Sequence, residues 1–431
     1  MKFLTKSNFG LVYIILLTLS IFTPRYGVLD RMSIQLFLLS ATNIFAIISI
    51  PLIFKSINIK KIVQSPLIIC FGGYILMSLL SMIKSINIVE SLARFNQIST
   101  FFLSLCVIVF LANEKAIKLN HVLGIVLITL LYDVGVSAYY FLETISVQNW
   151  NYDFNYLLAG FHGNRNITAA SIAFRIPFVI IIVTRLSNIN IKLFLFFIIT
   201  ISFLDIYLLA SRMALLSIII CLVTIIIISA YAKLKRGHEF FKFNKPILLY
   251  YILPCILAYS LTTYIFDPSD QGDVTNRISS LADSEDDSKN TRLRYYSHLS
   301  EHIFKNPLLG SGIGTWKIYS IKYDRENIRN YIIPFNAHND VLEVSAETGI
   351  IGGLFFLSFF GYLFFYLLKN LQKNHSDPHS YYYSLVMCLP FICYFIDLNL
   401  NFPSSRPFNQ YLLLLFIYII LYSNKSLNEK N

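Results

Sequence analysis

The chain has 431 residues, of which 56% are apolar and only 14% are charged, and its formal net charge is +11. One soluble core of this length cannot bury so large an apolar share, and disordered chains are poor in the aromatic residues that make up 16% of this one. The composition therefore excludes a soluble globular fold and a disordered chain, and it predicts an all-α, polytopic membrane protein.

Twelve stretches of the sequence are predicted to cross the membrane as α-helices, because a span needs about 20 mainly apolar residues. They are 9–23, 33–54, 66–83, 97–112, 121–143, 167–184, 191–210, 212–231, 246–266, 349–368, 379–398 and 408–423. The first follows Lys2 and Lys6, as the apolar core of a signal peptide would. No clear small-residue cleavage site follows it, and we expect it to remain as an anchor.

The distribution of positive charge favours one orientation of these spans. When the N-terminus is placed in the cytoplasm, the cytoplasmic segments hold most of the Lys and Arg residues, and the short outer loops hold fewer. We therefore expect both termini to be cytoplasmic. The same rule accounts for the net charge of +11, so we expect membrane lipids as partners and no nucleic acid.

This orientation divides the chain into three segments. Residues 1–266 contain the first nine spans, residues 267–348 form one large loop on the outer (periplasmic) side, and residues 349–431 contain the last three spans and a cytoplasmic tail. The loop is polar and long enough to fold, and we expect it to contain short helices and the catalytic residues.

Helical spacing and a glycine-rich turn are recognisable within this loop. A helix is predicted over 292–304, where four apolar residues recur at helical intervals, and Asn306-Pro307 ends it. The four are Leu293, Tyr296, Leu299 and Ile303. The sequence Gly310-Ser311-Gly312-Ile313-Gly314 follows. A lone glycine repeat without a preceding strand is weak evidence for a dinucleotide site, and we interpret it as a tight turn whose backbone amides can line a site.

Arg212 begins a span at the hairpin Ala210-Ser211-Arg212-Met213. Such an arginine can extend its guanidinium to the lipid headgroups without any further role. Alternatively, its planar array of donors suits the oxygens of a diphosphate.

The segment 161–166 enters another span, the sixth, from the predicted outer side. Asn and Gly residues there can cap the helix, or they can hold a sugar at the mouth of the span. Arg175 lies deeper in the same span and needs an internal partner, for which Asp133 and Asp205 are candidates.

His338 lies in the most polar constellation, 335–343, just before the tenth span. Asn339 or Asp340 is expected to cap a helix there, which places His338 at the start of that helix. A histidine can accept a hydroxyl proton near neutral pH, although a surface histidine without a role is also consistent with this position. His298 and His302 have the spacing of a metal-ligand pair, but no third ligand accompanies them, and we expect no metal site.

The order of these motifs resembles the O-antigen ligase and polymerase superfamily of bacterial inner-membrane glycosyltransferases. The resemblance rests on Gly163-Asn164-Arg165-Asn166, Leu209-Ala210-Ser211-Arg212, Thr291-Arg292-Leu293-x-x-Tyr296, Asn306-Pro307-Leu308-Leu309-Gly310-x-Gly312, His338-Asn339-x-x-Leu342 and Glu347-Thr348-Gly349-x-x-Gly352. One departure is Tyr296, where the family pattern has Trp.

The resemblance implies a donor glycan on undecaprenyl diphosphate, presented at the outer face of the bacterial inner membrane. His338 matches the essential histidine of the family, and Arg212 and Arg292 match the arginines that bind the diphosphate. The acceptor is then a sugar of lipid A-core or of a growing glycan, and neither a metal nor another cofactor is needed. Further candidates for contact with substrate are Gly163, Asn164, Asn166, Arg294 and Asn339.

Several functions remain compatible with these motifs. A ligase that attaches O-polysaccharide to lipid A-core is favoured, and a repeat-unit polymerase or a protein O-glycosyltransferase would use the same chemistry. A transporter or flippase for lipid-linked sugars belongs to another class. It would be expected to show matching interrupted spans in two halves of the chain, and the sequence shows no such pair.

Overall fold

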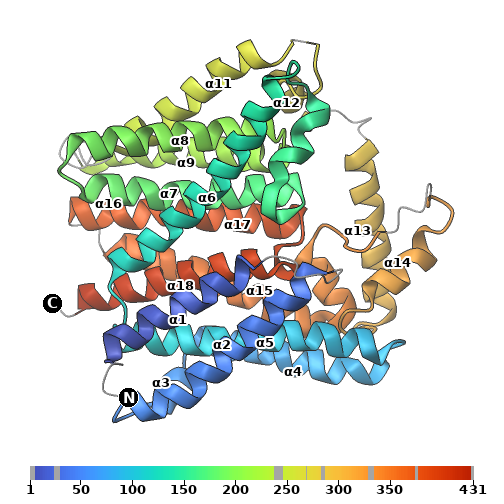
Figure 1. Cartoon of the computed structure of the whole chain (residues 1–431). Helices are drawn as coiled ribbons and strands as arrows, with labels where there is room; N and C mark the ends of the chain where they lie inside the picture. The colour runs from blue at the N-terminus through green and yellow to red at the C-terminus, as the bar shows by residue number, and fades with distance from the viewer. Residues whose placement is uncertain are drawn as a thin grey trace. The chain divides into compact units, whose positions relative to one another are not determined.

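A computed structural model describes residues 5–23, 30–236, 246–267, 269–282, 287–328, 334–373 and 377–428. Within these ranges every regular element is a helix, which confirms the predicted all-α class (Figure 1). Among the described residues, ten helices are long and apolar enough to cross a membrane, and α1 (Lys6–Ile21) and Pro407–Ser423 of α18 (Pro407–Asn428) are shorter apolar helices. Each predicted span overlaps one of these, so the chain is a polytopic membrane protein.

The long apolar elements follow one another with short connections. They are α2 (Arg31–Ile53), α4 (Pro66–Ser81) with η1 (Met82–Lys84), α5 (Ile88–Asn113), α6 (Leu119–Ile145), α7 (Arg165–Arg185), α8 (Ile189–Leu208), α9 (Arg212–Arg236), η3 (Leu248–Ile252) with α11 (Leu253–Ile265), α15 (Asp340–Lys373), and α16 (Pro378–Val386) with α17 (Cys388–Leu400). The other elements are α3 (Ile59–Val63), η2 (Tyr152–His162), α12 (Val274–Ala282), α13 (Asp287–Lys305), α14 (Trp316–Asp324) and η4 (Pro403–Ser405).

Prolines account for two irregularities in these helices. Pro390 has no N–H to donate to the carbonyl of Val386, and the chain breaks at Met387 between α16 and α17. Pro254 similarly follows the π-helical turn η3, which accommodates the proline ring against the preceding turn. The predicted spans 379–398 and 246–266 are therefore each interrupted by a proline.

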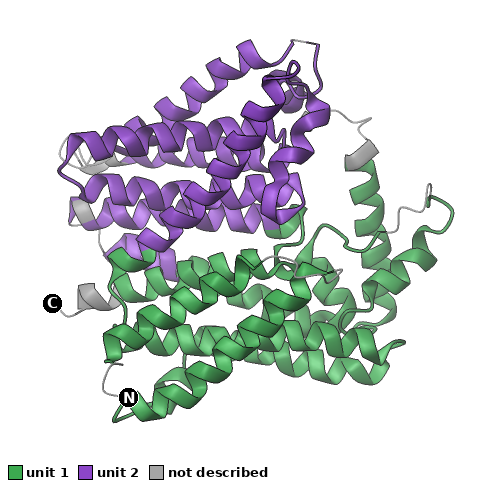
Figure 2. Ribbon diagram, in the orientation of Figure 1, with its two compact units in different colours: residues 1–122, 285–365, 398–431 green, residues 123–284, 366–397 purple. Residues whose placement is uncertain are grey.

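The chain forms two compact units (Figure 2). Unit 1 comprises residues 1–122, 285–365 and 398–431, and unit 2 comprises 123–284 and 366–397. In unit 1, α5 packs against α2, α4 and α18, and in unit 2, α8 packs against α7 and α11. The predicted loop contributes α12 to unit 2 and α13 and α14 to unit 1, while the predicted division of the sequence into three segments stays a prediction.

A small apolar cluster holds α13 and α14 in unit 1. Leu299, Trp316, Ala337 and Ala346 are buried together, and Tyr296 and Ile303 pack against them. This confirms the helix predicted over 292–304 and most of its apolar face. Leu293, the first apolar residue of this face, is 55% exposed and lies outside the cluster.

The glycine-rich turn joins the predicted loop to α15. Gly310 (φ 67°) and Gly349 (φ 78°) approach each other's chain segments so closely that an added Cβ on Gly310 would overlap the backbone of Glu347. The amides of Ser311 and Gly312 donate to the carbonyls of Ala346 (3.2 Å) and Glu347 (3.0 Å). The predicted tight turn is confirmed, but these two amides bind helix carbonyls and do not line a site.

Candidate functional site

The backbone around His338 is held in an unusual conformation. His338 has φ 59°, a left-handed value that few residues other than glycine adopt. The hydroxyl of Tyr296 donates to the carbonyl of His338 (2.9 Å), and the amide of Ala337 donates to Oε2 of Glu343 (2.7 Å). These hydrogen bonds tie the segment of His338 to α13 and to α15.

Asn339 caps the helix that follows, as predicted. Its side-chain oxygen accepts a hydrogen bond from the amide of Leu342 (3.0 Å), and α15 begins at Asp340. The side chain of Asn339 therefore has a structural role next to His338, and its contact with substrate stays a prediction.

The His338 imidazole is half-buried and lies edge-on against the Phe402 ring, with 5.2 Å between the ring centroids. Its Nδ1 atom is buried and has no hydrogen-bond partner among the residues the structure describes. Burial and the positive charge of Arg292 lower the pKa of His338 to about 4. The ring is therefore neutral near pH 7 and can accept a proton.

Two arginines of α13 have different surroundings. Arg292 is half-buried and close enough to His338 for its charge to act on the imidazole, so the structure brings these two predicted residues together. Arg294 instead binds Asp324 of α14 with two nitrogens, at 2.7 and 3.3 Å. This ion pair raises the pKa of Arg294 and links α13 to α14, and the predicted contact of Arg294 with substrate stays a prediction.

Arg212 of unit 2 also follows a left-handed residue. Ala210 has φ 50°, and the buried Oγ of Ser211 has no hydrogen-bond partner within the described ranges. Arg212 is half-buried at the start of α9. Its predicted convergence with Arg292 and His338 involves residues of both units and stays a prediction.

Unit 2 contains a cluster of three arginines that the sequence analysis did not find. Arg165 and Arg277 both lie over the ring of Tyr152, with their guanidinium carbons 4.8 and 4.2 Å from its centroid. Burial lowers the pKa of Arg277, and the charges of Arg165 and Arg212 lower it further. Nε and Nη2 of Arg277 are buried, with no hydrogen-bond partner in the described part of the chain. Such an array of donors and positive charge suits an anion.

Comparison with protein families gives one match, which covers the middle of the chain. Residues 194–357 match the family model described as O-antigen ligase. This match supports membership of the O-antigen ligase and polymerase superfamily. The matched residues include Arg212, Arg277, Arg292 and His338. No curated protein matches the chain.

The motif Gly163-Asn164-Arg165-Asn166 lies at the start of α7. Asn164 caps the helix, since its side-chain oxygen accepts hydrogen bonds from the amides of Asn166 (2.9 Å) and Ile167 (3.4 Å), and Gly163 takes a left-handed φ of 65°. The capping interpretation is confirmed, and contact of these residues with a sugar stays a prediction. Arg165 itself belongs to the arginine cluster.

Deeper in α7, the buried Arg175 is paired with Asp133 of α6. The sequence had left Asp133 and Asp205 open as partners. His162 also contacts Asp133, at 3.1 Å between Nε2 and Oδ2. This buried group joins η2, α6 and α7 and fixes the segment that carries Arg165.

The histidine pair of α13 has an aromatic environment. His302 is buried against the rings of Trp316, Tyr319 and Tyr323, and burial lowers its pKa to about 4. Among the described residues, no group of three or more His, Cys, Asp or Glu side chains is placed to hold a metal ion.

Proposed function

We propose that the protein is an O-antigen ligase-type glycosyltransferase of the bacterial inner membrane. It transfers a glycan from undecaprenyl diphosphate to a sugar hydroxyl of lipid A-core at the outer face, and both of its termini are cytoplasmic. The family match supports ligase- or polymerase-type chemistry. The observation that carries the specific proposal is His338, a neutral imidazole with an unpartnered nitrogen beside the cationic Arg292.

The chemistry follows from these two residues. His338 accepts the proton of the acceptor hydroxyl while the hydroxyl oxygen attacks the anomeric carbon of the donor. The bond between that carbon and the diphosphate oxygen breaks, and its electron pair leaves with the undecaprenyl diphosphate. Arg292 stabilises the charge that develops on the leaving group, and in-line attack inverts the configuration at the anomeric carbon.

The arginine cluster of unit 2 supplies a second source of positive charge. Arg212 binds the donor diphosphate in this proposal, and Arg165 and Arg277 extend its anion-binding surface. The support is the unpartnered Nε and Nη2 of Arg277, which a phosphate oxygen would satisfy. The proposed residues provide the proton acceptor and the positive charge, so the reaction calls on no metal ion and no nucleotide sugar.

A glycan profile of a deletion strain tests the proposal. Complementation with the wild-type gene should restore polysaccharide on lipid A-core, and complementation with His338→Ala should leave lipid-linked polymer accumulated and the core bare. His121→Ala is the matched control, because His121 is an exposed histidine at the start of α6. Immunoblots of the membrane fraction verify equal amounts of each variant.

Other glycan profiles of the complemented strains would indicate other functions. A core carrying a single repeat unit would identify a repeat-unit polymerase, because attachment still works and elongation does not. Glycan missing from proteins alone would identify a protein O-glycosyltransferase. A wild-type profile with His338→Ala would contradict the catalytic role of His338 and favour a lipid-linked sugar transporter.

A further inference from the structure

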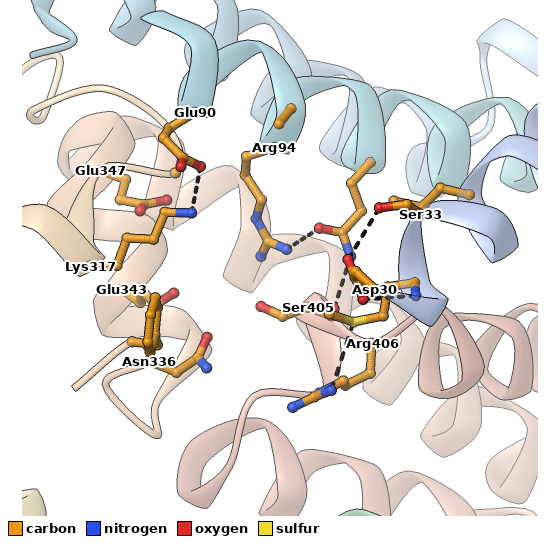
Figure 3. A pocket seen from close by; sticks show the side chains of 16 residues that line it. Asp30, Ser33, Glu90, Arg94, Lys317, Asn336, Glu343, Glu347, Ser405 and Arg406 are labelled. Carbon is orange, nitrogen blue, oxygen red and sulfur yellow. Dashed lines mark hydrogen bonds and ion pairs between the residues drawn. The ribbon is translucent and has the colours of Figure 1, made fainter. Parts of the chain in front are cut away.

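The first turns of α15 carry three acidic side chains on one face, at helical spacing: Asp340, Glu343 and Glu347. Each of the three accepts a hydrogen bond from the backbone of another segment. The donors are the amides of Ser404 (2.9 Å), Ala337 (2.7 Å) and Trp316 (2.9 Å), in the same order. Glu343 and Glu347 also line a cavity of unit 1 (Figure 3).

Glu343 is the one of the three that is bonded directly to the segment of His338. Its Oε2 accepts the amide hydrogen of Ala337, the residue before His338. Its own amide donates to the carbonyl of Asn339, the residue after His338 (3.0 Å). Glu343 therefore binds both chain neighbours of His338, and both the Glu343 side chain and Ala337 are buried.

The left-handed backbone of His338 depends on such restraints. A residue other than glycine keeps a φ of 59° only where its surroundings fix it. The hydroxyl of Tyr296 holds the carbonyl of His338, and Glu343 holds the amide of Ala337, so this pair of residues is fixed at both ends. Loss of either partner would leave a backbone group unpaired and favour another conformation, in which the imidazole leaves the ring of Phe402.

The hydrogen bond from Ala337 goes to a carboxyl group that is largely neutral. α15 is interrupted at Gly349 (φ 78°, ψ 170°), where the predicted span begins, so Glu343 precedes the membrane-spanning part of the helix. Burial raises the pKa of Glu343 to about 8, and the charges of Glu347 and Asp340 contribute to this rise. The segment of His338 therefore uses the acceptor oxygen of Glu343 and not its negative charge.

We propose that Glu343 is a positioning residue for the transfer reaction, which holds His338 in its reactive orientation through the backbone amide of Ala337. This inference rests on the proposed function. A general base acts only from the correct place, and a displacement of about 1 Å can lower a rate about 100-fold. Glu343 should therefore affect kcat and leave binding of the donor unchanged.

Two uncharged substitutions of similar length separate the acceptor oxygen from the rest of the side chain. Glu343→Met removes the acceptor and should lower kcat about 10- to 100-fold without a change in donor KM. Glu343→Gln keeps an acceptor for Ala337 and should retain kcat within about twofold. Glu347→Met is the matched control, because it removes the acceptor for the amide of Trp316 from the same face of α15. It should lower the Tm as Glu343→Met does, with little effect on kcat.

The pH profile of kcat/KM distinguishes positioning from a loss of stability. Burial and the charge of Arg292 lower the pKa of His338 to about 4. When the imidazole leaves this place, its pKa should rise and the acid limb should move to higher pH. We expect this shift in Glu343→Met and no shift in Glu343→Gln or Glu347→Met. Tyr296→Phe is a second variant, which removes the other hydrogen bond and should move the limb in the same direction.

Chemical modification reports on the position of His338 without any transfer. The full-length protein in nanodiscs is treated with diethyl pyrocarbonate, and mass spectrometry follows the modification of each histidine. His121 is exposed and serves as the reference within the same molecule. Relative to His121, His338 should react faster in Glu343→Met than in the wild type, and Glu343→Gln should behave as the wild type does.

The outcomes separate this proposal from the function on which it rests. An equal loss of kcat in Glu343→Gln and Glu343→Met would overturn the proposal, because the acceptor oxygen would not be the cause. If transfer requires His338 while Glu343→Met changes neither kcat, the acid limb nor the modification rate, the positioning role fails and the function stands. If His338→Ala retains full transfer while modification of His338 depends on Glu343, the catalytic function fails and the positioning of His338 by Glu343 stands.

Discussion

Arg294 and Arg277 lie on two helices of the same predicted loop, but the surroundings of their guanidinium groups differ. Arg294 of unit 1 has its charge balanced by Asp324, which binds two of its nitrogens. Arg277 of unit 2 is surrounded by further arginines, and two of its buried nitrogens have no partner among the described residues. The ion pair between Arg294 and Asp324 stabilises the fold. A bound anion would compensate for the positive charge of Arg277 and accept hydrogen bonds from its buried nitrogens.

The same contrast separates the two parts of the proposed mechanism. His338 of unit 1 is a neutral imidazole near a single arginine, Arg292, which suits proton transfer. The arginine cluster of unit 2 combines like charges, which suits a diphosphate. Four predictions can break or sharpen this comparison, and they are taken in order of decreasing expected effect.

The largest effect is expected for His338→Ala. Removal of a positioned general base should lower kcat by about 10²- to 10⁴-fold, with little change in the KM of the donor. The measurement is transfer by purified protein in nanodiscs, with His121→Ala as the control. A large increase in donor KM at normal kcat would instead place His338 among the binding groups.

Arg277→Gln is expected to weaken donor binding by about 10- to 100-fold, because it removes charge-assisted hydrogen bonds to the diphosphate. Inorganic diphosphate should raise the Tm of the wild-type protein and should do so less in the variant. Without ligand, Arg277→Gln should unfold at the same temperature as the wild type or a higher one, because like-charge repulsion with Arg165 and Arg212 is relieved.

Arg325→Gln is the matched control for that experiment, because the Arg325 side chain is 76% exposed at the end of α14. It should leave donor KM and the response to diphosphate unchanged. An equal effect of both substitutions would show that donor binding depends on the net charge of the protein and not on the arginine cluster. Arg277 would then have no special role in anion binding.

Arg294→Gln should lower stability and leave donor binding almost unchanged, which is the opposite of the result expected for Arg277→Gln. It leaves the buried carboxylate of Asp324 without its cation, and we expect a loss of about 1–3 kcal/mol in the free energy of unfolding. Donor KM should change little. Thermal unfolding in nanodiscs measures the first effect, and a stable Arg294→Gln variant with poor donor binding would mean that Arg294 contacts substrate.

The sequence predicted the features that depend on neighbours in the chain. The spans follow from apolar runs, and the cap formed by Asn339 and the turn around Gly310 follow from local backbone chemistry. Ion pairs between distant residues could not be predicted from the sequence. The sequence left Arg175 with two possible partners, and the folded structure pairs it with Asp133 of α6. Periodicity also does not show which residues of a face are buried, and Leu293 is 55% exposed although Leu299 on the same helix is buried.

The candidate functional residues that the sequence analysis missed are not marked by any pattern among their neighbours in the chain. Arg277 is a single arginine in a polar segment, and its neighbours Arg165 and Arg212 precede it by more than 60 residues. The cavity of unit 1 shown in Figure 3 is likewise lined from several separate segments, so that Arg94 and Glu343 line one cavity only after folding. A motif search finds contiguous patterns, whereas both of these groups are assembled by tertiary structure.

The smallest effect concerns pH and distinguishes a buried from a surface histidine. Because only neutral His338 can accept a proton and its pKa is lowered to about 4, transfer should not decline as the pH falls through 6.5, where an ordinary histidine becomes protonated. The acid limb should appear only near the lowered pKa, shifted upward when an anionic donor is bound. Arg292→Gln removes a positive charge that opposes protonation of His338, so the pKa should rise and the acid limb should move to higher pH. A pH–rate profile of kcat/KM for both proteins measures this shift, and a wild-type limb centred near 6.5 would show that His338 is solvated rather than held in a partly buried site beside Arg292.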